Sequence, residues 1–111
     1  MDVTVEPREP GTAVVRLSGR LDLLSAGAVK ERLASAVAGG HPRLVVDLGA
    51  VPFVDSSGLG ALIGGLKAAR LAGGDLRLAR PAEQAAMILE LTNQSRVLRA
   101  YATVEEALAG F

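Results

Sequence analysis

The fold of this chain is constrained most by an alternation, along 111 residues, between short strand-like segments and longer segments with helical periodicity. Apolar and polar residues alternate over 3–8, as they do in a half-exposed strand, and residues 12–18 form a second strand-like segment. Pro10-Gly11 between them is a strong turn signal. The sequence therefore predicts that the two segments form an antiparallel hairpin. Pro7 and Pro10 place the first strand at a sheet edge, where a missing N–H does least harm.

The rest of the chain alternates helices and strands. Apolar spacing of three and four residues, glycine pairs and a capping box indicate helices at 25–38, 57–72, 82–92 and 103–109. Between these helices, the predicted strands are 43–48, 75–79 and 97–101. Strands joined by helical crossovers form a parallel sheet. The predicted fold is therefore α/β, in the order β-β-α-β-α-β-α-β-α: a mainly parallel sheet of about five strands with an antiparallel N-terminal edge strand and four helices.

The helix assignments also predict helix ends and buried faces. Ser25 is expected to cap the first helix, and Asn93 to follow the third helix in a left-handed conformation. Glycines within the second helix weaken it, so we expect close packing to offset their cost. Two apolar stripes are expected to face the core: Leu59, Leu62, Ile63 and Leu66 on the second helix, and Ala85, Ile88, Leu89 and Leu91 on the third.

Composition limits the classes of function. The length suits one domain, 1–111, and half of the residues are hydrophobic, which is enough for a core. With 12 basic and 12 acidic side chains the net charge is zero, which argues against direct nucleic-acid binding. The longest apolar run, 58–66, is too short to span a membrane, and the first residues contain no apolar leader segment. We expect a cytoplasmic protein without membrane contact, and a monomer is favoured.

The densest polar cluster is Asp55-Ser56-Ser57-Gly58, at the start of the second helix and beyond a predicted central strand. In open α/β sheets, sites form at the carboxyl ends of the strands. An ordinary capped helix start is one interpretation of the cluster. The other is a functional site, because one cap needs only one side chain and a serine at a helix N-terminus can hold a phosphate. Gly58 is expected to leave the backbone and hydroxyls accessible.

Catalysis is not predicted, and neither is a cofactor or a metal. The only histidine, His41, precedes the strand whose far end leads to Ser56, so a base for a serine triad would lie at the opposite end of the sheet. The three aspartates near the strand ends, Asp22, Asp47 and Asp55, have no His or Cys companion that would make a metal site. No phosphate-binding glycine loop with the required spacing is present.

The stretch D-S-S-G-L-G at 55–60 lies between the strand 44–48 and a helix that ends at Gly73-Gly74. In this order of elements it resembles the STAS domain of the bacterial anti-anti-sigma factors, also called anti-sigma factor antagonists. The segment Gly19-x-Leu21-Asp22 is similar to the one that follows the second strand in that family. Arg20 departs from the pattern, because the family usually has Glu there.

The resemblance implies a regulator without catalytic activity. In that family, the unphosphorylated protein binds an anti-sigma factor, usually a serine kinase of the GHKL type, and this binding frees a sigma factor. The kinase then phosphorylates the first serine of the motif, binding is lost, and a phosphatase reverses the change. That serine maps to Ser56, with Ser57 as the alternative acceptor. The expected surroundings of the site, which the partner would contact, are Asp22, Asp55, Ser57, Gly58 and Leu59.

Two other functions stay open: a STAS-like module that binds a ligand such as a nucleotide, and an interaction module that works without phosphorylation. The phosphorylation hypothesis makes a geometric prediction. Ser56 should lie at or just before the N-terminus of the second helix with its hydroxyl reachable by solvent, and Asp22 should lie nearby on the adjacent strand end.

Overall fold

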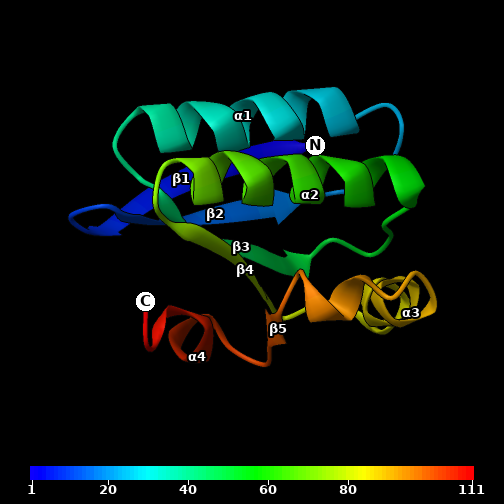
Figure 1. The fold of residues 1–111 in the computed structure, drawn as a ribbon. Helices are drawn as coiled ribbons and strands as arrows, with labels where there is room; N and C mark the ends of the chain where they lie inside the picture. The colour runs from blue at the N-terminus through cyan, green and yellow to red at the C-terminus, as the bar shows by residue number, and fades with distance from the viewer.

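The computed structural model describes all 111 residues and contains five strands, four α-helices and one short 3-10 helix, η1 (Figure 1). The strands are β1 (Asp2–Glu9), β2 (Thr12–Ser18), β3 (Arg43–Ala50), β4 (Asp75–Ala79) and β5 (Ala100–Tyr101). The helices are α1 (Ala26–Ala38), α2 (Ser56–Leu71), α3 (Glu83–Leu91), η1 (Gln94–Arg96) and α4 (Val104–Leu108).

The strands form one sheet in the order β1-β2-β3-β4-β5. The edge strand β1 is antiparallel to β2, in a register that pairs Val5 with Val15, and every other neighbouring pair is parallel. In Figure 1, α1 and α2 lie side by side over one face of the sheet, and α4 lies under the other face. The helix α3 lies toward the end of the sheet at which β2 and β3 end. The predicted architecture and the edge position of the first strand are confirmed.

Apolar side chains on both faces explain why β2 and β3 are the central strands. Val15 and Val46 belong to the larger core cluster, which α1, α2 and α3 cover. Val14 and Val45 point the other way, into a smaller cluster with α4. Strands buried on both faces have continuous apolar runs instead of alternation, as β3 does.

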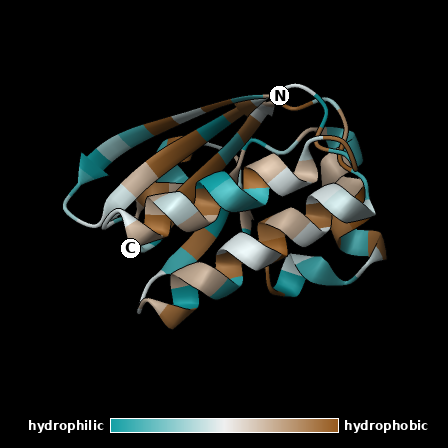
Figure 2. Cartoon of the chain, turned by 90° about the horizontal axis from the view of Figure 1, so that it is seen from above, coloured by the Kyte–Doolittle hydropathy of each residue, from teal (hydrophilic) through white to brown (hydrophobic).

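The two covering helices are amphipathic, and they pack closely. Figure 2 looks down on α1 and α2 and shows hydrophilic and hydrophobic bands alternating along both. Leu59, Leu62 and Leu66 are buried as predicted, whereas Ile63 is partly buried. A Cβ on Gly65 would lie 2.6 Å from the Leu33 side chain of α1, so this glycine allows the close helix packing that the sequence led us to expect.

Two local predictions are wrong, and a third holds only for position. Leu91 is 79% exposed because it lies two residues, or about 200° of helix turn, beyond the buried Leu89. The last strand is only Ala100–Tyr101, since η1 and its C-cap Val97 occupy the start of the predicted segment. Ser25 is the N-cap residue of α1, as predicted, but its side chain makes no cap hydrogen bond. Its hydroxyl instead donates to the Arg20 carbonyl oxygen at 2.7 Å and stabilises the preceding turn. Asn93 is left-handed, as predicted, with φ of 60°.

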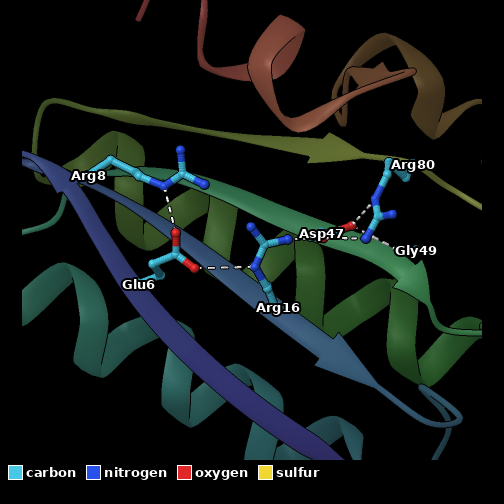
Figure 3. A network of polar contacts seen from close by, with 6 residues as sticks. All are labelled: Glu6, Arg8, Arg16, Asp47, Gly49 and Arg80. Atoms are coloured by element: carbon cyan, nitrogen blue, oxygen red, sulfur yellow. Dashed lines mark hydrogen bonds and ion pairs between the residues drawn. The ribbon is translucent and has the colours of Figure 1, made fainter.

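The face opposite α1 and α2 carries a chain of ion pairs at its centre (Figure 3). The Asp47 side chain, 3% exposed, accepts from Arg16 at 2.6 Å and from two nitrogens of Arg80 at 2.9 and 2.7 Å. Burial acts to raise the pKa of Asp47, but the hydrogen bonds from Arg80 and the Gly49 N–H, together with the positive charges of Arg80 and Arg16, outweigh it, so this pKa is lowered. The same pairing raises the pKa of Arg80.

Arg80 also turns the chain out of the sheet. Its φ of 54° is left-handed, an uncommon conformation for a non-glycine residue, and its pairing with Asp47 holds it there. The turn directs the chain through Pro81 to α3, whose first residue is Glu83. None of the helices has both the length and the apolar content that a membrane span requires.

Candidate functional site

The segment before α2 extends the sheet by one bridge beyond the named strands. Leu21 pairs with Val54 in parallel orientation. The Leu21 N–H donates to the Phe53 carbonyl oxygen at 2.9 Å, and the Asp55 N–H donates to the Leu21 carbonyl oxygen at 3.2 Å. The bridge brings the turn after β2, with Asp22, beside the loop after β3, with Asp55. The predicted proximity of Asp22 to the start of the second helix is confirmed.

Asp55 caps α2 and ties it to the neighbouring turn. One carboxylate oxygen accepts from the Gly58 N–H at 2.9 Å, and the other accepts from the Leu23 N–H at 3.1 Å. The extended backbone of Asp55 is typical of an N-cap residue. A single carboxylate therefore fixes both the helix start and the turn that carries Asp22.

Ser56 is the first residue of α2, and its side chain is exposed; Ser57 follows and is half-buried. Neither hydroxyl takes part in a hydrogen bond, and the cap is provided by Asp55. The first backbone N–H groups of a helix have no partner within it, and together with the helix dipole they favour an anion nearby. The predicted position and solvent access of Ser56 are confirmed.

Gly58 and Leu59 have structural roles that differ from the expected ones. Gly58 is buried, and a Cβ on it would lie 2.2 Å from the Leu21 carbonyl oxygen, so the glycine lets the helix approach the bridge. It does not open the site to solvent. The Leu59 side chain is 5% exposed and belongs to the core, so it supports the helix start from below and offers little surface to a partner.

Two features of the site were missed by sequence reasoning. Leu23 and Leu24, next to Asp22, are 74% and 94% exposed. Two adjacent leucines in a turn are the signal that could have revealed this surface. Gln84 of α3 hydrogen-bonds to both backbone polar groups of Val54 at 2.8 Å, a contact across thirty positions that no local pattern predicts.

The charge around the site is mixed. Asp22 and Asp55 contribute two carboxylates, and the Arg20 Nε lies 3.5 Å from Asp22. The Arg20 guanidinium also lies over the Phe53 ring, 4.2 Å from its centroid. Arg20 therefore stands between the two loops and places a positive charge beside the carboxylates.

Comparison with known proteins assigns the family. Residues 4–107 match the family model described as the STAS domain. The chain belongs to the STAS domain family. Its aligned region is 33% identical over 69 residues to the TM1081 homolog of Thermotoga neapolitana, and covers 62% of this chain and 61% of that protein. It is 43% identical over 49 residues to the anti-sigma-F factor antagonist RsfB of Mycobacterium tuberculosis, and covers 44% of this chain and 40% of RsfB. The STAS alignment thus spans about three-fifths or less of these curated relatives.

Solved structures match over nearly the whole STAS chain. An anti-sigma factor antagonist from Mycobacterium paratuberculosis is 29% identical with a TM-score of 0.85, and the match covers 96% of this chain and 90% of that one. Unphosphorylated SpoIIAA, an anti-sigma factor antagonist, has a TM-score of 0.81 at 23% identity, covering 96% and 93%. The murine anion transporter Slc26a9 shares the fold at 14% identity over 18% of its own length, with a TM-score of 0.77. The STAS fold thus occurs in proteins of different function.

Proposed function

We propose that this protein is an anti-sigma factor antagonist whose unphosphorylated form binds an anti-sigma factor and so releases a sigma factor. The observation that carries the proposal is the exposed Ser56 at the N-terminus of α2, with its hydroxyl unbonded and a separate residue, Asp55, acting as the cap. Relatives named as anti-sigma factor antagonists support the class of function. The protein would act in the cytoplasm, as a regulator without catalytic activity of its own.

The surface beside Ser56 suits a protein partner. Leu23 and Leu24 expose apolar side chains within the turn that Asp55 holds against the start of α2. Exposed leucines next to carboxylates give an apolar contact with a charged rim, which is the usual composition of a protein interface. We assign this turn, together with Ser56, to the anti-sigma contact.

Phosphorylation would switch the contact off by charge. A phosphate on Ser56 adds about −1.5 to −2 charges next to the Asp55 and Asp22 carboxylates. The free N–H groups at the helix start can hold the phosphate, so the fold does not have to change. A loss of 10²–10³ in affinity needs about 3–4 kcal/mol, which like-charge repulsion and desolvation across an interface can supply. A phosphatase would restore binding.

Ser56 is the better acceptor of the two serines on structural grounds. A kinase must reach the hydroxyl and the chain on both sides of it, and Ser56 is exposed while Ser57 is half-buried. Ser57 stays as the alternative acceptor.

The test is incubation with a purified GHKL-type anti-sigma kinase and ATP, followed by phosphopeptide mapping by mass spectrometry. We expect label on Ser56 in the wild type, none in Ser56→Ala, and normal labelling in the matched control Ser57→Ala. Label on Ser57 alone would move the acceptor by one residue. If the kinase binds stably but neither serine is labelled, the protein is an interaction module that works without phosphorylation, and not a switch.

A further inference from the structure

The backbone of Val54, two residues before Ser56, is bonded on two sides. On one side, the N–H and carbonyl oxygen of Leu21 bond to the residues flanking Val54, at 2.9 and 3.2 Å. On the other side, the Val54 N–H donates to the Gln84 Oε1 and the Val54 carbonyl oxygen accepts from the Gln84 Nε2, both at 2.8 Å. The Gln84 amide therefore takes the place that the next strand would have in a sheet.

An amide side chain suits this position. It offers a donor and an acceptor side by side, as a peptide group does. Val54 is 2% exposed, so water has little access to replace either bond. The orientation of the amide is also fixed, because each of its two ends faces a backbone group of the opposite kind.

The helix that carries Gln84 has further anchors besides its bonds to the loop. Ala85 and Leu89 of α3 are buried in the main core. The chain enters α3 from Arg80, which is paired through two nitrogens with the buried Asp47. The loop before Ser56 is thus attached through Gln84 to a fixed part of the molecule.

We propose that Gln84 is a positioning residue that holds residues 53–55 in place and so fixes Ser56 at the start of α2 for its kinase and its partner. The inference rests on the proposed function of Ser56. It goes beyond that function in assigning part of the site to α3, which contributes no group to the phosphorylated motif.

The first test needs no kinase. Amide hydrogen exchange is measured by NMR in the wild type, in Gln84→Met, which keeps the length without the amide, and in Gln84→Glu, which loses the donor. The matched control is Gln94→Met, because the Gln94 side chain makes none of the hydrogen bonds in the structure. In Gln84→Met we expect exchange at Val54 and Asp55 to become about tenfold faster or more, relative to Leu33 in α1. In Gln84→Glu the increase should be smaller, because a carboxylate oxygen can still accept from the Val54 N–H. Gln94→Met should show no such change.

Two outcomes of the exchange experiment would overturn the proposal. One is unchanged exchange at Val54 in Gln84→Met. The other is an equal increase at Val54 and Leu33, which would mean that the variant only destabilises the whole fold.

The second test measures the consequence for Ser56 with the GHKL-type kinase. If the loop is less often in place, a smaller fraction of the protein presents Ser56 in the conformation that the kinase can bind. We therefore expect KM for Gln84→Met to rise with little change in kcat. Fast exchange at Val54 with an unchanged KM would overturn the link to Ser56. Absence of label on both Ser56 and Ser57 of the wild type would instead overturn the proposed phosphorylation switch, and the exchange result would still decide whether Gln84 holds the loop.

Discussion

Asp55 caps α2, whereas Ser56 is exposed and makes no hydrogen bond, and single substitutions test this difference. Asp55→Ala removes the cap and the bond to Leu23, so we expect a loss of about 1–2 kcal/mol in the free energy of unfolding. Ser56→Ala removes an exposed hydroxyl without a partner and should change it by no more than about 0.5 kcal/mol. Urea unfolding of both variants measures this. If Ser56→Ala were the more destabilising change, Ser56 and not Asp55 would be the cap.

Two glycines of the same helix provide a matched pair. A Cβ on Gly58 would lie 2.2 Å from the Leu21 carbonyl oxygen, whereas a Cβ on Gly60 would meet nothing within 4 Å. We therefore expect Gly58→Ala to destabilise by about 1–3 kcal/mol, because backbone has to shift, and Gly60→Ala to stabilise by up to about 1 kcal/mol. Thermal unfolding followed by circular dichroism measures both. Equal effects would mean that Gly58 does not make the close approach.

At the residue scale, the sequence predicts roles that depend on neighbouring residues and misses those that depend on residues far away along the chain. A polar run before an apolar stripe predicts a capped helix start, and Asp55 and Ser56 lie there. The role of Gly58 depends on a carbonyl group 37 positions earlier, and that of Gln84 on a backbone thirty positions away. Such contacts have no local spacing that a single sequence can reveal.

At the scale of elements, Asp47 joins three strands and carries a prediction about pH. It lies on β3 and pairs with Arg16 on β2 and with Arg80 at the end of β4. Its pKa in the folded state is lowered, so its contribution to stability is present above the unfolded value, about 3.9, and is lost as pH falls through the lower folded value. We expect Asp47→Asn to cost about 1–3 kcal/mol at pH 7.

The measurement is urea unfolding of the wild type and Asp47→Asn at pH 7 and at successive values below 4. The difference between the two proteins should shrink as the pH falls, since protonation removes the same charge from the wild type. A difference that stayed constant down to pH 2 would show that the charge of Asp47 does not set it, and that the loss of a hydrogen-bond-accepting oxygen does.

Elements with strong periodicity could be predicted, and those fixed by tertiary contacts could not. β3 and α2 stand out in the sequence through an apolar run and an apolar stripe. β5 is two residues long and exists because it pairs with the end of β4. The apolar character of Leu91 predicts an inward side chain, but the helix geometry that buries Leu89 turns Leu91 toward solvent.

At the scale of the whole molecule, the partner surface should lie at one end of the sheet. Leu24→Gln, at a side chain 94% exposed beside Asp22, is expected to weaken binding of the anti-sigma factor tenfold or more, while the free energy of unfolding changes by no more than about 0.5 kcal/mol. Leu71→Gln is the control, because Leu71 is 91% exposed but is the last of the sixteen residues of α2, at the opposite end of the helix from Ser56. Isothermal titration calorimetry with the purified anti-sigma factor compares the two. Equal losses of affinity in the two variants would contradict a partner surface confined to the end of the sheet that carries Leu24.

The central claim is that a phosphate on Ser56 controls binding, and calorimetric titration of one anti-sigma factor with two forms of the protein tests it most directly. The forms are the unmodified chain and the chain phosphorylated on Ser56 to completion, with circular dichroism confirming that both are folded. Our account predicts a Kd that is 10²–10³ larger for the phosphorylated form, or about 3–4 kcal/mol. Equal affinity of the two forms would contradict it.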